Sequence, residues 1–372
     1  MTLPVKPAFR AGAAALLFGG LCASSLDAQG ASALASRERA ALDAFFAAEI
    51  ARLRAPGLSV AIVRDGEVVY AEGFGFSRVA DGTEAGPETI YRTASVAKAL
   101  TATAVLQLAS TGRMDLAEPV QRYCPAFPEK RWAVTVEHLL SHTSGVRHAS
   151  DGEDAQTTFY SEVRDALGLF VGDSLLHEPG ARVTYSTLGY MLLACAIEGA
   201  TGRAYVEYLT EHVLAPAGMV ATTRDTVSHE DRRRALGYRM TSGGLAPSDR
   251  VDTSFKLAGG GLSSTALDLA RFAIAMEGGA LLPPEWVARM WSAPTLPDGT
   301  VSPFGWGWQV ATRDGEKLAV IAGQQDEVSS VLVVIPGRRA AIVLMSNLER
   351  SAPQFWALVP RIRELAGMGS QR

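Results

Sequence analysis

The sequence predicts an α+β fold, in which an antiparallel sheet built from both termini is flanked by helices and carries an inserted, mainly helical subdomain. Strand-like segments lie near both ends of the chain, helix-like segments dominate between them, and each end also carries one helix-like segment. We place the sheet part at residues 37–95 and 301–368 and the helical insertion at residues 96–300. Residues 37–368 then form one domain.

Size and composition agree with a folded globular protein. The chain has 372 residues, of which 48% are hydrophobic and 20% are charged, so it can bury a full core. The net charge of −4 and the pI near 5.9 argue against a nucleic-acid partner, which usually requires a basic excess.

The first residues predict a secretory signal peptide. Lys6 and Arg10 precede a short apolar run from Ala11 to Leu26, and small residues follow near Ala28. We expect residues 1–28 to be removed, which predicts a secreted or periplasmic protein with no stable membrane insertion after cleavage. The remaining chain keeps only Cys124 and Cys195, too few for a disulfide framework, and we interpret Cys195 as a small apolar core residue.

The amino-terminal part of the sheet begins with a helix. Apolar residues recur at helical spacing from Arg37 to Leu53, and Pro56-Gly57 ends the pattern. Two β-branched runs, Leu58 to Val63 and Val68 to Ala71, then enclose Asp65-Gly66, which predicts a hairpin.

The carboxyl-terminal part of the sheet is predicted from four further runs and a closing helix. Pro336-Gly337 predicts a turn between the last two strands, and an amphipathic pattern predicts the helix Ala352 to Leu365. The expected strands are Gly305 to Val310, Leu318 to Ile321, Ser330 to Ile335 and Ala340 to Met345.

The middle of the chain is predicted to be mostly helical. Strong helix formers from Ala97 to Ala109, the apolar run Tyr190 to Ile197, and Leu267 to Met276 after Thr265 all predict helices. The polar, acidic segment Asp151 to Thr158 predicts an exposed loop.

The first candidate for chemistry is Ser95-Val96-Ala97-Lys98. A helix that begins here places the Lys98 amine beside the Ser95 hydroxyl, because residues i and i+3 share one face. A lysine confined among apolar residues resists protonation and can accept the serine proton. The helix N-terminus stabilises negative charge that develops on oxygen. Ser-x-x-Lys is a short pattern, so it needs support from other segments.

Two further segments give that support. Tyr185-Ser186-Thr187 lies at a loop-to-helix junction, where a tyrosine can exchange a proton with a leaving group. The strand Leu318 to Ile321 continues into Ala322-Gly323-Gln324-Gln325 and offers backbone donors to an extended substrate.

These three segments have the order and spacing of one family. The chain resembles serine β-lactamase-like proteins, which include class C β-lactamases, penicillin-binding D-Ala-D-Ala peptidases and related esterases. The resemblance covers roughly Arg37 to Leu365 and includes the segments Leu139 to Gly145, Gly259 to Thr265 and Gly305 to Trp308. It is greatest to the branch of the mitochondrial serine β-lactamase-like protein and its bacterial relatives, over Val120 to Lys130, His142 to His148 and Tyr185 to Tyr190.

The resemblance implies a serine hydrolase that forms a covalent acyl-enzyme at Ser95 and hydrolyses an ester or an amide. Lys98 would be the base and Tyr185 the acid and base, without a metal or a cofactor. Backbone N–H groups of Ser95 and Gln324 would form the oxyanion hole. The expected substrate is a small ester, a β-lactam or a peptide, and nothing indicates an oligomeric state. The residues expected to bind substrate are Thr187, Gly323 and Gln324.

One departure from the family pattern concerns substrate charge. Relatives carry Lys or His two residues before the strand glycine, where this chain has Ile321. Asp326 and Glu327 also stand where small or apolar residues are usual. A site that loses a cation and gains acids should bind anionic substrates poorly. The same departure leaves open a weak or inactive family member that binds peptides or cell-wall fragments.

A metal site is the other alternative. His138 and His142 are four residues apart, and His148 is near. Leu139 occupies the position of a general-base glutamate, and His142 begins a loop, so we favour structural histidines bonded to the loop backbone.

Overall fold

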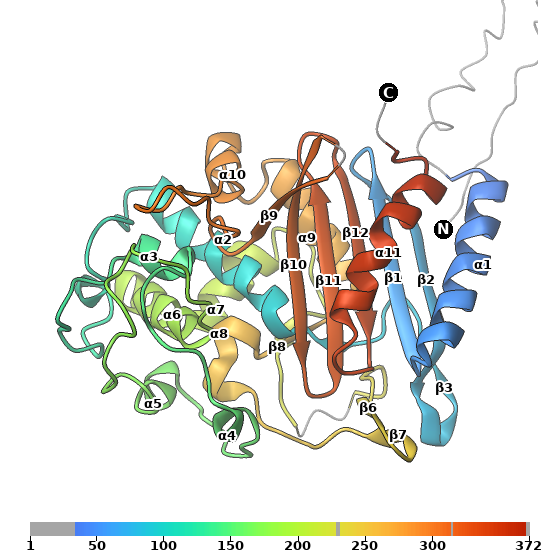
Figure 1. The fold of residues 1–372 in the computed structure, drawn as a ribbon, viewed down its shortest axis with the longest axis horizontal. Coiled ribbons are helices and arrows are strands. Elements are labelled where there is room, and N and C mark those ends of the chain that lie inside the picture. Colours follow the sequence, from blue (N-terminus) through green and yellow to red (C-terminus); the bar gives the residue numbers. More distant parts are fainter. Residues whose placement is uncertain (1–33, 228–230, 314, 370–372) are drawn as a thin grey trace, which may run out of the picture. The chain divides into compact units, whose positions relative to one another are not determined.

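A seven-stranded antiparallel sheet forms the centre of the fold in the computed structural model, which describes residues 34–227, 231–313 and 315–369 (Figure 1). Its strand order is β3-β2-β1-β12-β11-β10-β9, so the strands from the two ends of the chain meet where β1 pairs with β12. The predicted signal peptide lies outside the described residues. The strands are β1 Gly57–Arg64, β2 Glu67–Arg78, β3 Thr83–Glu84, β9 Gln309–Arg313, β10 Glu316–Gln325, β11 Val328–Ile335 and β12 Ala340–Ser346.

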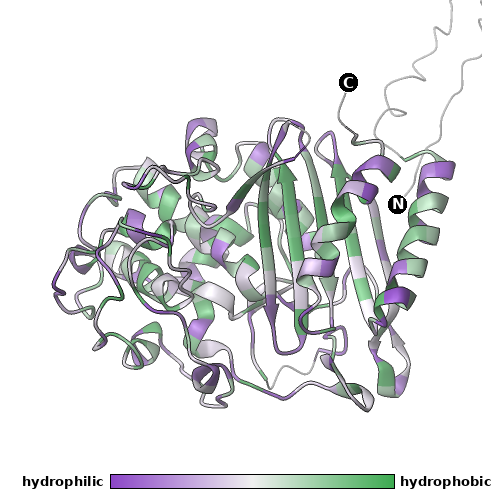
Figure 2. Cartoon of the chain, viewed as in Figure 1, coloured by the Kyte–Doolittle hydropathy of each residue, from purple (hydrophilic) through white to green (hydrophobic). Residues whose placement is uncertain are grey.

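The central strands are buried on both faces, which explains their nearly continuous apolar sequences. Alternate side chains of β1 belong to two separate apolar clusters. Val60 and Ile62 pack with α1 (Ser36–Leu53) and α11 (Ala352–Leu365). Ala61 belongs to the cluster on the opposite face, where α9 (Ala266–Glu277) packs on β1 and β12. Figure 2 shows the resulting hydrophobic strands.

The helical region is built around two buried helices that pack on each other, α2 (Ala97–Ser110) and α6 (Leu188–Thr201). A small sheet, β4 (Tyr91–Arg92), β8 (Leu262–Ser264) and β5 (Thr223–Arg224), joins it to the main sheet region. The other elements are α3 Val136–Leu140, α4 Asp151–Asp154, α5 Val163–Leu167, α7 Tyr205–Leu209, α8 Leu257–Gly260, α10 Pro284–Met290 and the hairpin of β6 Tyr238–Thr241 with β7 Gly244–Pro247.

The fold class predicted from the sequence is confirmed. The hairpin around Asp65-Gly66 is present, and both turn residues have positive φ, at 55° and 82°, as such two-residue turns require. The helices at both ends also occur where predicted.

Two local predictions are wrong. Only Gln309 and Val310 of the predicted strand Gly305 to Val310 lie in a strand. Gly307 has a φ of 79°, and a Cβ added there would lie 2.7 Å from Ala102 Cβ of α2, so the chain bends into the helical region at this glycine. The Gly-Trp-Gly-Trp segment therefore has the alternating pattern of a strand without forming one. The predicted loop at Asp151 to Thr158 also contains a short helix, α4, which Ser150 caps.

The interpretation of Cys195 as an unpaired core residue is also wrong. Cys124 and Cys195 form a disulfide, with their Cα atoms 5.3 Å apart. The two cysteines are separated by 71 residues, and only the packing of α6 against the Cys124 segment brings them together. Gly199 permits this approach, because a Cβ there would lie 1.7 Å from the carbonyl oxygen of Tyr123.

Candidate active site

Ser95 lies on a 3-10 turn, Ala94–Val96, that connects β4 to α2. Ala94 has a φ of 46°, an uncommon conformation for a residue with a side chain. The turn packs directly on the end of β10. A Cβ added to Gly323 would lie 2.8 Å from the backbone nitrogen of Ser95 and 2.8 Å from the carbonyl oxygen of Thr93. Glycine at position 323 therefore allows the strand to touch the backbone of Ser95.

Lys98 lies in the first turn of α2 with its side chain buried beside Ser95. Its Nζ lies 3.3 Å from Ser95 Oγ, 3.1 Å from Thr187 Oγ1 and 2.5 Å from the carbonyl oxygen of Gly259. Burial lowers the pKa of Lys98 well below its usual value, and the nearby Lys256 lowers it further, while Asp154 opposes the shift. A neutral Lys98 has two N–H groups for Gly259 and Thr187, which leaves its lone pair free for the Ser95 hydroxyl.

Tyr185 lies on the other side of Ser95. Its Oη is 2.6 Å from Ser95 Oγ, and the Lys98 Nζ is 4.8 Å from the centre of its ring. Burial raises the pKa of Tyr185 to about 12, although hydrogen bonds with Ser95 and Thr187 partly oppose the shift. Near neutral pH Tyr185 therefore keeps its proton and can donate it to the Ser95 oxygen.

Two histidines hold the Tyr185 segment in place. His142 Nδ1 accepts from the backbone N–H of Ser186 at 3.2 Å, and His148 Nδ1 accepts from that of Thr187 at 3.1 Å. The ring centres of His142 and Tyr185 are 4.4 Å apart. Burial lowers the pKa of both histidines, so both are neutral acceptors near neutral pH.

The third histidine of the metal hypothesis caps a helix. His138 Nδ1 accepts from the backbone N–H of Thr135 at 3.2 Å, at the start of α3. All three histidines thus accept hydrogen bonds from the backbone, as the structural interpretation expects. Within residues 34–227, 231–313 and 315–369, no group of three or more His, Cys, Asp or Glu side chains is placed to hold a metal ion.

These residues open into a cavity of about 840 Å³. Its wall includes five of the six site residues expected from the sequence, and the sixth, Gly323, lies beneath Ser95. Along β10, pairing with β9 ends at Val320, so the strand edge beyond it faces no further strand in the described part of the chain. Other residues of the wall are His142, His148, Asp151, Asp154, Asp249, Lys256, Phe304, Ile321, Asp326, Glu349 and Arg350.

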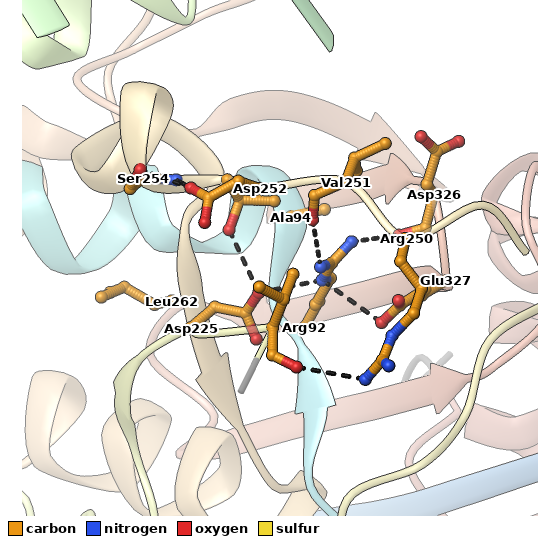
Figure 3. Close-up of polar contacts among 12 residues, drawn as sticks. Arg92, Ala94, Asp225, Arg250, Val251, Asp252, Ser254, Leu262, Asp326 and Glu327 are labelled. Carbon is orange, nitrogen blue, oxygen red and sulfur yellow. Dashed lines mark hydrogen bonds and ion pairs between the residues drawn. The ribbon is translucent and has the colours of Figure 1, made fainter. Parts of the chain in front are cut away.

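Four largely buried charged residues, Arg92, Asp225, Arg234 and Glu327, form a network next to the Ser95 segment. Figure 3 shows Arg92 between Asp225 and Glu327. Arg92, three residues before Ser95, donates to Asp225 at 2.9 Å and to the carbonyl oxygen of Val251 at 2.7 Å, and its Nε lies 3.4 Å from Glu327. Arg234 pairs with both acids. Arg92 thereby connects the Ser95 segment with the turn that follows β10.

The ion pairs of Glu327 correct the expectation that both Asp326 and Glu327 repel an anionic substrate. Glu327 is paired with Arg92 and Arg234 and is absent from the cavity wall, so it does not repel an anionic substrate directly. Asp326 does line the cavity, and burial and the nearby Glu349 raise its pKa. The structure adds four further carboxylates to the wall that the motif did not indicate: Asp151, Asp154, Asp249 and Glu349.

Comparison with known families agrees with this arrangement. A family model described as Beta-lactamase matches residues 42–366. The chain belongs to the beta-lactamase family. The resemblance to serine β-lactamase-like proteins is thus confirmed, and this fold family comprises serine hydrolases such as penicillin-binding proteins, esterases and amidases.

Individual members of the beta-lactamase family show the extent of the similarity. Protein flp of Staphylococcus aureus (strain MW2) is 29% identical over 303 residues, which cover 79% of this chain and 60% of flp. The mouse serine beta-lactamase-like protein LACTB, mitochondrial, is 29% identical over 386 residues, covering 76% of this chain and 70% of LACTB. The chain thus spans about three fifths of the length of flp.

A solved structure shows the same fold. The octameric penicillin-binding protein homologue from Pyrococcus abyssi superposes with a TM-score of 0.77 at 27% identity, covering 88% of this chain and 77% of that one. None of the helices in the described part of this family member is long and apolar enough to cross a membrane.

Proposed function

We propose that this protein is a serine hydrolase that cleaves a small ester or amide through an acyl-enzyme at Ser95. The observation that carries the proposal is the contact of Ser95 Oγ with both Lys98 Nζ, at 3.3 Å, and Tyr185 Oη, at 2.6 Å, on the wall of one cavity. A hydroxyl held between a buried amine and a phenol is the arrangement that activates a serine. The catalytic domain that we propose comprises residues 37–368.

The proposed reaction has two halves. Ser95 Oγ attacks the substrate carbonyl and passes its proton to Lys98. The backbone N–H groups of Ser95 and Gln324 stabilise the negative charge on the carbonyl oxygen. Tyr185 donates a proton to the departing alcohol or amine and regains one from Lys98. In the second half Lys98 takes a proton from a water molecule, which attacks the acyl carbonyl. The Ser95 oxygen leaves and takes a proton from Tyr185, and Tyr185 regains one from Lys98.

The opposite pKa shifts of Lys98 and Tyr185 support this division of roles. A base must be unprotonated before the reaction, and the lowered pKa of Lys98 favours its neutral amine. An acid must be protonated, and the pKa of Tyr185 near 12 keeps its phenol intact. We infer that Lys98 is also the base that activates the deacylating water. Activity should therefore fall as the pH drops through the pKa of Lys98.

The test of the proposed function is covalent labelling. A serine-directed fluorophosphonate should add one adduct per chain, on the peptide that contains Ser95, and the Lys98→Met protein should react far more slowly. Absence of labelling in folded protein would reject the hydrolase and favour the alternative, a weak or inactive relative that binds peptides or cell-wall fragments. Adduct formation on another serine would reject Ser95 as the nucleophile.

A second prediction concerns substrate charge. Ile321 lines the cavity with an apolar side chain. Arg147, next to His148 of the cavity wall, pairs with Glu153 at 2.7 Å and Asp173 at 2.6 Å. A missing charge-assisted hydrogen bond weakens binding by about 1.5–3 kcal/mol, or about ten- to a hundredfold. We therefore expect neutral short-chain esters to be hydrolysed far better than nitrocefin.

The variant Ile321→His should narrow that difference by restoring a donor for the substrate carboxylate. The measurement is kcat/KM for nitrocefin and for p-nitrophenyl butyrate in both proteins, with the ester as the internal control. Efficient nitrocefin hydrolysis by the unmodified protein would show that another cation of the cavity, such as Arg350, binds the carboxylate.

We also propose a secreted or periplasmic location. The disulfide between Cys124 and Cys195 supports it, because disulfides persist mainly in oxidising compartments. The predicted signal peptide at residues 1–28 agrees with this proposal.

A further inference from the structure

A second lysine lines the cavity. The chain has only five lysines, and two of them, Lys98 and Lys256, lie on this wall. Lys256 comes from the 3-10 turn Ser254–Lys256 before α8, and its side chain is 8% exposed. It forms an ion pair with Asp154 of α4, whose side chain is 39% exposed. The reaction proposed above uses neither residue of this pair.

The pair lies close to the proposed base. Lys256 is three residues before Gly259, whose carbonyl oxygen accepts the 2.5 Å hydrogen bond of Lys98. One short segment therefore supplies both a backbone acceptor for the Lys98 amine and a second ammonium group. Position 321 of β10 is apolar, so Lys256 of the helical region and Arg350 are the cations of the cavity wall besides Lys98.

The other titratable groups around Lys98 are uncharged near neutral pH. The rings of Tyr185 and Tyr190 lie 4.8 Å and 5.6 Å from its Nζ, and both phenols have raised pKa values. The lowered pKa values of His142 and His148 keep both imidazoles neutral. Two charged groups shift the pKa of Lys98: the Lys256 ammonium lowers it and the Asp154 carboxylate raises it. The other charged groups of the cavity wall are Asp151, Asp249, Asp326, Glu349 and Arg350.

We propose that Lys256 and Asp154 are an opposed pair of positioning residues that set the protonation of Lys98. The inference depends on the proposed role of Lys98 as the base. The Lys256 ammonium disfavours a second positive charge beside it and so favours the free amine. The Asp154 carboxylate favours the ammonium form of Lys98 and limits this effect. Burial remains the largest cause of the lowered pKa of Lys98, and the pair adjusts it.

The two charges can be removed separately with little change of shape. Lys256→Met deletes the ammonium and keeps an apolar stem of similar length. Asp154→Asn deletes the carboxylate at a position that is partly exposed. Lys256→Met should move the acidic limb of the pH profile of kcat/KM to higher pH, and Asp154→Asn should move it to lower pH, each by about half a pH unit or more.

The opposite signs distinguish this proposal from a structural role. Both substitutions break the same ion pair, so loss of a purely structural contact would change both profiles in the same direction. The substrate is p-nitrophenyl butyrate, and Lys317→Met, at an exposed position near the start of β10, is the matched control and should leave the profile unchanged. Shifts in the same direction, or no shift in folded variants, would overturn the proposal.

A readout without turnover separates this inference from the proposed function. With only five lysines, the ε-carbon signals of 13C-labelled lysine can be titrated individually by NMR, and Lys98→Arg identifies the signal of Lys98. Opposite shifts of the Lys98 titration in the two variants would support the pair even if no ester were hydrolysed. Turnover that depends on Ser95, together with an unshifted Lys98 titration, would reject the pair and keep the hydrolase.

Discussion

Replacing Ser95 by alanine is expected to lower kcat/KM for p-nitrophenyl butyrate by on the order of a thousandfold or more, because a proposed acyl-enzyme cannot form without its nucleophile. The side chain is small and lies at the cavity wall, so its loss should leave the fold intact. The measurement is steady-state hydrolysis, with circular dichroism to confirm that the variant is folded.

The matched control is Ser161→Ala, an exposed serine before α5 that does not line the cavity. It should retain full activity. Unchanged hydrolysis by folded Ser95→Ala protein would show that another group attacks the ester. The proposed roles of Lys98 and Tyr185 would then also be rejected.

Replacing Arg92 by methionine is expected to lower the free energy of unfolding by about 3–5 kcal/mol, because removing one partner of a buried ion pair leaves an uncompensated buried charge. The Arg92 and Asp225 side chains are each 1% exposed. Burial alone would raise the pKa of Asp225, but Arg92 and Arg234 outweigh it and leave that pKa below its usual value. Without Arg92, Arg234 alone among the described residues pairs with both Asp225 and Glu327.

Urea unfolding at neutral pH measures this effect, provided that the slope of the transition is unchanged. Arg233→Met is the matched control, since Arg233 pairs with Asp231 at the surface with 54% of its side chain exposed. An exposed ion pair contributes about 0–1 kcal/mol to stability, so the free energy of unfolding of the control should be close to that of the unmodified protein. A loss of less than about 1 kcal/mol in Arg92→Met would contradict the proposed importance of the buried network.

Local sequence was sufficient for the elements whose signals are local. The hairpin at Asp65-Gly66 depends on two residues that tolerate positive φ, and the closing helix Ala352–Leu365 depends on an amphipathic period. The spacing of Ser95 and Lys98 places both side chains on one helical face, and the structure brings them to 3.3 Å. The strand predicted at the Gly-Trp-Gly-Trp segment is absent. The alternation of small and large residues has the period of a strand, but it does not reveal that the backbone bends at Gly307.

Periodicity and short motifs were enough to predict the fold class and the family, and both are confirmed. The same motifs indicated six site residues, which the structure brings together at one cavity and whose roles we propose. Tertiary packing alone decided which distant charges meet. It paired Cys124 with Cys195 across 71 residues, and it removed Glu327 from the cavity by pairing it with Arg92 and Arg234. It also brought Lys256 to the cavity that contains Lys98. Such contacts carry no signature along the chain, since the energy of an ion pair depends on the distance between its charges and on burial, and only the folded chain defines either.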